Sequence, residues 1–139
     1  MSVITKNFTL ETKGHTQILD ITQKVKGIMA DSPLSSGIAV VFVPGSTAGI
    51  TSIEYESGVV QDLAEAIERL APRSIHYKHD ARWGDGNGYA HVRAALMGAS
   101  FTVPFRNKQL LLGTWQQIVL IDFDNRPRSR DIIVQLMGE

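Results

Sequence analysis

Apolar and polar positions alternate with different periods along the 139-residue chain, and each period predicts a different element. Near the N-terminus, apolar side chains are set among threonines and other polar residues, which is typical of β-strands. We expect strands over residues 3–12 and 15–20 with a short turn between them. A helix should follow, capped by Asp20 or Thr22 and ending near Pro33.

The middle of the chain predicts two strands and the clearest helix. Residues 37–43 form a continuous apolar run bounded by small residues and a Pro-Gly pair, as expected for a strand buried on both faces. A second strand is predicted over residues 48–55. The helix should begin at Ser57 and continue to Leu70, because apolar residues recur there every three or four positions.

The last third of the chain is predicted to be β-rich. Asn87 can cap a short helix that Gly98 ends. Three strands should follow as a meander of antiparallel hairpins, over residues 99–104, 109–124 and 131–137. Gly113 interrupts the longest of these runs and indicates a bulge or a close backbone approach.

Two main helices and one short helix among about eight strands indicate the α+β class. We predict one domain over residues 1–139, with a mixed or antiparallel sheet folded onto itself as a β-sandwich. A sheet of this size with few helices to cover it needs a second layer to bury its apolar face.

Composition narrows the classes of function. The 14 basic and 14 acidic residues give zero net charge, so nothing suggests a nucleic-acid partner or an anionic membrane surface. The chain has no cysteine, which excludes disulfides and thiolate-bound metals. We see no signal-peptide pattern and no apolar run of membrane-spanning length, and therefore expect a cytoplasmic protein.

Candidate chemistry is concentrated in residues 76–91, which hold three of the four histidines. His79 and His91, with Asp85 between them, offer the two imidazoles and one carboxylate found in catalytic zinc and non-haem iron sites. Their separation of twelve residues matches no compact metal motif. The alternative interpretation is a histidine-rich exposed turn, because the intervening Gly-Asp-Gly-Asn-Gly segment has typical turn composition.

Two polar features earlier in the chain are also candidates. Ser46 and Thr47 lie in a turn of small residues whose hydroxyl and N–H groups suit phosphate, although a plain tight turn is the commoner explanation. Glu54, at the end of the following predicted strand, could act as a general base or ligand. It could equally be the polar start of the next helix.

Two further features lie nearer the C-terminus. Thr114, Trp115 and Gln116 interrupt an apolar run, and a buried tryptophan and glutamine would need partners, so this segment is expected to line a pocket or an interface. Arg128 is the middle of three alternating arginines that could bind phosphate through paired N–H groups. An exposed basic turn is the simpler alternative.

Several segments, taken together, match the pattern of one known family. They are Gly45-Ser-Thr-Ala-Gly-Ile-Thr51 with Glu54, Tyr77-Lys-His79, Asp85-Gly-Asn87, Ala90-His91, Leu96-Met-Gly98, Thr102-Val-Pro104 and Leu112-Gly-Thr-Trp-Gln-Gln117. On these segments, which span nearly the whole chain, the sequence resembles the YjbQ family of secondary thiamine-phosphate synthases. It departs from many members at Gly45 and Tyr89, where they carry histidine.

The resemblance implies a homotrimer of α+β subunits with a β-sandwich core. It implies a site that gathers His79, Asp85, Asn87 and His91 with the Ser-Thr-Ala turn around a divalent metal. We assign the metal to His79, His91 and Asp85, and expect zinc, with manganese or magnesium as alternatives.

The implied activity is transfer of thiamine-phosphate-synthase type, joining a pyrimidine pyrophosphate to a thiazole phosphate. We assign catalytic roles to Glu54, Asp85 and Asn87. Binding of substrate or phosphate is assigned to five polar side chains: Ser46, Thr47, Thr114, Gln116 and Arg128. The alternative enzyme is a metal-assisted hydrolase of a phosphorylated metabolite, in which Glu54 activates water. Two further alternatives are not enzymes: a trimer that binds a small anion, and an assembly protein with an interfacial Trp115 segment.

Overall fold

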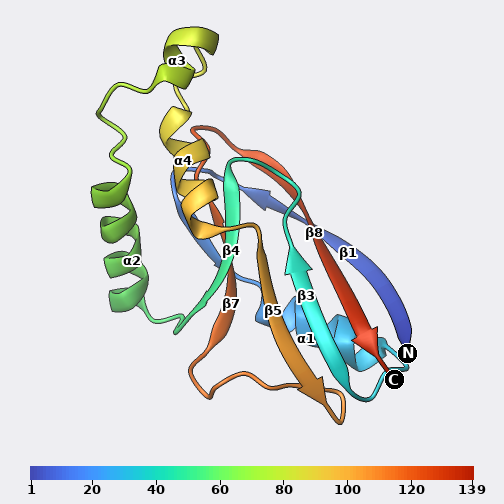
Figure 1. The fold of residues 1–139 in the computed structure, drawn as a ribbon. Helices are drawn as coiled ribbons and strands as arrows, with labels where there is room; N and C mark the ends of the chain where they lie inside the picture. Colours follow the sequence, from blue (N-terminus) through green and yellow to red (C-terminus); the bar gives the residue numbers. More distant parts are fainter.

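The computed structural model describes residues 1–139 and contains eight strands and four helices (Figure 1). The strands are β1 (Ser2–Thr12), β2 (Gln17–Asp20), β3 (Gly37–Phe42), β4 (Ala48–Ile53), β5 (Ser100–Arg106), β6 (Gln109–Leu110), β7 (Gln117–Asp122) and β8 (Arg128–Gly138). The helices are α1 (Thr22–Asp31), α2 (Ser57–Leu70), α3 (Lys78–Trp83) and α4 (Gly88–Met97). No helix combines the length and the apolar character needed to cross a membrane.

The strands form two sheets in which every neighbouring pair is antiparallel. The larger sheet has the order β1-β8-β3-β5-β6, and the smaller one β2-β7-β4. β1 pairs with β8 along its full length, from Ser2 opposite Gly138 to Thr12 opposite Arg128, so the two ends of the chain lie together (Figure 1). The predicted α+β class with a folded antiparallel core is confirmed.

Two apolar clusters stabilise this arrangement, and β7 contributes to both. Ile118 and Leu120 belong to a cluster of 16 buried residues that joins both sheets to α1. Val119 and Ile121, with Phe123 just after the strand, belong to a second cluster of 8, which includes residues of α2 and α4. Because successive side chains of a strand point to opposite faces, the uninterrupted apolar run of β7 serves both layers.

β3 was predicted to be buried on both faces, and this is wrong. Ala39, Val41 and Val43 are fully buried, whereas Ile38 and Phe42 are 40% and 39% exposed. Only the inner face of the larger sheet is therefore covered at these positions. A run of apolar residues alone cannot distinguish this case from β7.

The predicted C-terminal meander is also wrong. β5 and β6 do form a hairpin, but the expected long strand over residues 109–124 divides at the turn where Gln116 N–H donates to the Gly113 carbonyl. β7 then enters the smaller sheet, and β8 pairs with β1 and β3 in the larger one. Gly113, expected to mark a bulge or a close backbone approach, lies where the chain leaves one sheet for the other.

The helices α1, α2 and α4 occur where the sequence predicts them, and α3 is additional. α3 has no buried residue, so it has no apolar stripe that would reveal it in the sequence. α3 and the start of α4 lie together at one end of the molecule, above the β7–β8 turn (Figure 1). This end carries the histidine-rich segment.

Candidate functional site

His79 on α3 and His91 on α4 lie against each other at this end of the molecule. Their ring centroids are 4.4 Å apart, with the ring planes inclined by 48°. Asp85, in the turn between the two helices, places its carboxylate Oδ2 3.6 Å from His79 Nε2. The structure thus places both other predicted metal ligands, His91 and Asp85, next to His79.

The local sequence explains how α3 is held against α4. Gly84 ends α3 in the left-handed region at φ 72°. The Asp80 carboxylate then accepts a hydrogen bond from Gly88 N–H at 2.8 Å, which ties α3 to the first turn of α4. A Cβ on Gly88 would lie 2.5 Å from Tyr77 Cβ, so only glycine permits this close approach.

His91 is placed where an uncharged imidazole is favoured. Burial lowers the pKa of His91 below its usual value, and the neighbouring His79 lowers this pKa further. The carboxylates of Asp124, Asp85 and Asp80 only partly oppose this effect. His91 is therefore neutral at pH 7 and can act as a proton acceptor or as a metal ligand.

The donor set fits a divalent metal in its chemistry. His79 Nε2 is buried and has no hydrogen-bond partner, as expected for a nitrogen that needs a ligand. However, no three His, Asp or Glu side chains in the chain converge closely enough to enclose an ion. His79 and His91 are consequently the two side chains that could hold a metal directly, with Asp85 beside them.

The two positions at which the sequence was expected to depart from the family, Gly45 and Tyr89, lie outside this pair. Gly45 approaches Arg130, whose guanidinium lies 3.0 Å from where a Cβ would be. Tyr89 is 2% exposed and packs in the second apolar cluster, with Arg93 stacked 4.9 Å from the centre of its ring. The His79–His91 pair is thus assembled without either position.

A buried carboxylate, Asp124, lies beneath the site and was missed by the sequence analysis. Its Oδ1 accepts hydrogen bonds from Asn87 Nδ2 at 3.2 Å and from Asn125 N–H at 2.8 Å. Its Oδ2 accepts from the Thr47 hydroxyl at 3.0 Å and from Arg128 Nε at 2.8 Å. Burial alone would raise the pKa of Asp124, but these hydrogen bonds outweigh burial and lower the pKa to about 2.

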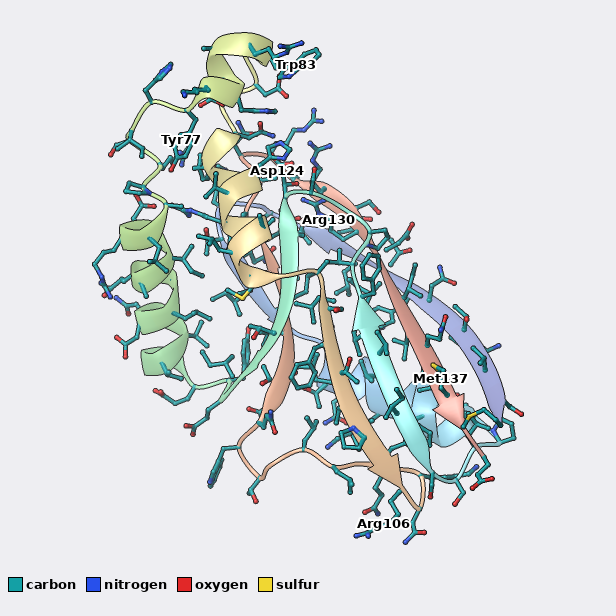
Figure 2. The ribbon with its side chains drawn as sticks, in the orientation of Figure 1. Tyr77, Trp83, Arg106, Asp124, Arg130 and Met137 are labelled. Atoms are coloured by element: carbon teal, nitrogen blue, oxygen red, sulfur yellow. The ribbon has the colours of Figure 1, made fainter.

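A second buried carboxylate, Asp122, pairs with Arg130. Arg130 donates from Nε to Asp122 Oδ2 at 2.7 Å and from Nη2 to Oδ1 at 3.0 Å. Its Nη2 also donates to the Thr47 hydroxyl at 2.7 Å, so that hydroxyl is already used twice and is not free to bind phosphate. Figure 2 shows Asp124 and Arg130 at the end of the sheets nearest α3.

Asp122 and Asp124 alternate at the end of an apolar strand, and Arg128 and Arg130 alternate after the next turn. This pattern is the signal from which the network could have been found. Opposite charges at matching positions on either side of a tight turn can meet as ion pairs. The predicted phosphate ligand Arg128 is therefore also a structural partner of Asp124.

A polar cavity of about 310 Å³ opens beside the histidines. It is lined by Asp85, Asn87, Asn125, Arg126 and Arg128, with no apolar side chain. Two guanidinium groups and two amides suit an anion such as phosphate. Larger hollows of about 410 Å³ and 500 Å³ lie elsewhere, and neither is lined by a histidine.

Three predicted site residues lie at the opposite end of the smaller sheet. Glu54 follows β4, and Thr114 and Gln116 precede β7, whereas the other end of β7 leads to the site. The six residues of β7 separate the two ends by about 17 Å. Trp115, in the segment expected to line a pocket or an interface, is 70% exposed.

Ser46 lies next to Thr47 at the site, but it is exposed to solvent. It is exposed in the turn that precedes Thr47, whose hydroxyl is held by Asp124 and Arg130. One chain therefore brings together eight polar residues of interest: Ser46, Thr47, His79, Asp85, Asn87, His91, Arg126 and Arg128.

These features define an α+β protein of two antiparallel sheets, with a histidine pair and a polar cavity at one end. The chain belongs to the family described as UPF0047 protein YjbQ-like, which matches residues 6–139. A UPF0047 protein of Archaeoglobus fulgidus is 37% identical over 129 residues, covering 93% of this chain and 98% of the relative. The UPF0047 protein YugU of Bacillus subtilis is 33% identical over 135 residues, covering 96% and 98%.

Solved structures of similar proteins have the same fold. A YbjQ-like protein of unknown function from Sulfolobus solfataricus superposes with a TM-score of 0.90 at 31% identity, covering 99% of this chain and 100% of the other. A conserved protein of the YjbQ/UPF0047 family from Clostridium acetobutylicum gives a TM-score of 0.87 at 38% identity, covering 95% and 99%. At these identities and coverages the whole domain is shared.

The low pKa of Asp124 predicts a loss of stability in acid. A carboxyl whose pKa falls from 3.8 to about 2 on folding stabilises the folded chain above pH 4, and this contribution disappears as pH falls toward 2. The difference corresponds to about 2 kcal/mol of unfolding free energy. Urea unfolding between pH 5 and 2 should show an acid-dependent loss that is about 2 kcal/mol smaller in Asp124→Asn than in wild type, because Asp122, whose pKa is also lowered on folding, keeps its own share in both proteins.

The exposed carboxylate Asp62 on α2 provides the matched control. Asp62→Asn should keep the wild-type pH dependence of the unfolding free energy. The same dependence in Asp124→Asn as in wild type would contradict the assignment of this loss to Asp124.

Proposed function

We propose that this protein is an enzyme that acts on a small phosphorylated metabolite with the help of a divalent cation. One observation carries the proposal: Asp85 lines the Arg- and Asn-rich cavity and also lies 3.6 Å from His79 of the imidazole pair, so the cavity adjoins that pair. The cavity suits the phosphate, and the imidazoles suit the cation. Neither group alone would argue for catalysis.

Each side of the site has a defined role in this proposal. Arg126 is exposed at the rim of the cavity, and Arg128 uses Nε and Nη2 on Asp124, which leaves its Nη1 N–H groups for phosphoryl oxygens. His79 and His91 would hold the cation, with Asp85 beside them. A bound zinc or manganese ion would stabilise negative charge on a phosphoryl oxygen.

The reaction we favour is the thiamine-phosphate-synthase type. The bond between the pyrimidine methylene carbon and pyrophosphate breaks, pyrophosphate leaves with the electron pair, and the thiazole nitrogen bonds to the carbon. The chain would hold two phosphorylated substrates together and stabilise the departing pyrophosphate. Asp85 and Asn87 can take part at the cavity. Glu54, Thr114 and Gln116 can do so only if a second copy supplies them.

The reaction is tested by incubating purified protein with the two thiamine precursors and zinc or manganese. Thiamine phosphate should form in wild type, and Arg126→Ala should lower kcat/KM at least tenfold, because a charged hydrogen bond to phosphate is worth about 1.5–3 kcal/mol. Arg69→Ala, on the exposed face of α2, is the matched control and should leave the rate unchanged. Release of inorganic phosphate without thiamine phosphate would instead support a hydrolase.

The metal assignment has its own test, which does not need a substrate. His79→Ala and His91→Ala should each lose zinc after reconstitution at pH 7, because each removes one of two imidazole ligands. His76→Ala removes an exposed histidine three residues before His79 and should retain the wild-type content. Equal metal content in all four proteins, or none in wild type, would rule the site out.

We also propose a homotrimer in the cytoplasm. The family resemblance supports the trimer, as do exposed apolar residues on α2 and α4, where Leu70 is 73% and Leu96 66% exposed. Sedimentation equilibrium should give three times the 15.3 kDa mass of one chain. A single species of 15.3 kDa at micromolar concentration would contradict it.

A further inference from the structure

The buried polar atoms that lack a partner are confined to one short segment of the chain. They are His79 Nε2, Asn87 Oδ1 and the Tyr89 hydroxyl. Asn87 is only 5% exposed and lines the polar cavity. Although Asn87 occupies the position before α4, its side chain makes no capping hydrogen bond. Its amide is instead held by Asp124.

The chemistry of Asp124 fixes which way the Asn87 amide points. An ionised carboxylate can only accept hydrogen bonds, and Asp124 accepts them on both oxygens. Asn87 must therefore turn its nitrogen toward Asp124, and its carbonyl oxygen must point the other way. That oxygen is the buried acceptor without a partner.

We propose that Asp124 is a positioning residue that fixes the Asn87 carbonyl as an acceptor in the cavity, so that the site selects phosphate ligands that also carry an electropositive group. That group is an ammonium or hydroxyl of the ligand, or a divalent cation bound to it. The phosphate part of this inference rests on the proposed function. The orientation of Asn87 does not.

The two oxygens of Asp124 position different side chains. Oδ1 holds the amide nitrogen of Asn87 and so presents an acceptor, while Oδ2 holds Arg128 and so presents a donor. Both side chains line the same cavity. A ligand with a negative end and a positive end satisfies both, whereas a plain anion leaves the Asn87 oxygen without a partner.

Variants at Asp124 and Asn87 separate orientation from folding. In Asp124→Asn, the new amide can keep its oxygen on Arg128 and Thr47 only by turning its nitrogen toward Asn87 and giving up the hydrogen bond from Asn125 N–H. Asn87 must then turn over and present N–H groups to the cavity. In the double variant Asn87→Asp/Asp124→Asn, the new carboxylate accepts from the amide and again presents an oxygen. Asn87→Ala removes the acceptor and leaves Asp124 its other partners.

The test compares two phosphates that differ in one group, ethyl phosphate and 2-aminoethyl phosphate, by equilibrium titration. Wild type should bind the 2-aminoethyl ester at least tenfold more tightly. This preference should disappear in Asp124→Asn and Asn87→Ala and return in the double variant. If Asp124 had a purely structural role, the variants would bind both esters more weakly by the same factor, and the ratio of the two affinities would not change. This ratio is therefore the informative measurement.

Mn²⁺ alone distinguishes the two sources of positive charge. If a cation is the natural partner, Asp124→Asn should weaken Mn²⁺ binding while the two esters bind alike. Equal affinity for the two esters in wild type, together with Mn²⁺ binding that neither Asp124→Asn nor Asn87→Ala changes, would overturn the inference. So would complete absence of binding by both the 2-aminoethyl ester and Mn²⁺.

Side-chain amide NMR provides a readout that is independent of any ligand. The Asn87 amide protons should exchange slowly in wild type, because they face Asp124, and rapidly in Asp124→Asn. Rapid exchange in wild type would overturn the proposed orientation. Failure of the proposed function has a different signature: neither ester binds, while Mn²⁺ binding and slow exchange of the Asn87 amide persist.

Discussion

The carboxylate pair Asp122 and Asp124 is the constraint on which the site end of this molecule depends. Both carboxylates are fully buried, and each pairs with an arginine beyond the β7–β8 turn, Arg130 and Arg128. Buried charge is tolerated only when it is paired and fully hydrogen-bonded, and here both carboxylates meet that condition. Because β7 and β8 belong to different sheets, these ion pairs join the two sheets at this end. The Thr47 turn and Asn87 are attached to the same network.

Stability alone does not explain a network of this kind. Buried ion pairs can often be replaced by apolar residues of similar volume with little loss, and sometimes with a gain, in stability. Apolar residues at these positions could join the sheets, but they could not orient an amide or hold a guanidinium at a cavity. The polarity of the network is therefore explained by the groups that it presents: the Asn87 carbonyl oxygen and the remaining N–H groups of Arg128.

The elements that could be predicted are those marked by the pattern of residues within their own segment. α2 and α4 follow from apolar periodicity and end signals, and the class follows from the number of strands. α3 could not be predicted, because it has six residues, none buried, and is held by the tie between Asp80 and Gly88. The partners of β8 could not be predicted either, since β1 lies at the other end of the sequence. Pairing between strands so far apart in the sequence produces no pattern of residues that identifies the partner.

The site was predicted in part, for a similar reason. His79, Asp85, Asn87 and His91 are close in sequence, and the fold keeps them close. Asp124, beneath them, lies 37 positions after Asn87 and was read, with Asp122, only as the end of a strand. Asp124 is the clearest case, because its role depends on a contact with Asn87 that no spacing in the sequence indicates.

The Gly-Thr-Trp-Gln-Gln segment, which carries much of the family resemblance, lies away from the histidines. Part of it has a structural explanation within one chain. Gln116 accepts a hydrogen bond from Gly113 N–H and donates to the Ser52 hydroxyl, while the Gln117 side chain accepts one from Tyr55 N–H. These bonds attach the loop before β7 to β4 and account for both glutamines.

Trp115 has no such explanation, because its side chain is 70% exposed although the next residue, Gln116, is held by hydrogen bonds. A large apolar side chain at that exposure contributes little to the stability of a single chain. A surface outside the chain would cover it, and the homotrimer proposed above would supply one. If that surface is a second copy, the far end of the smaller sheet becomes an interface, and Glu54 and Thr114 lie beside it. The distance that separates them from His79 within one chain would then no longer exclude them from a shared site.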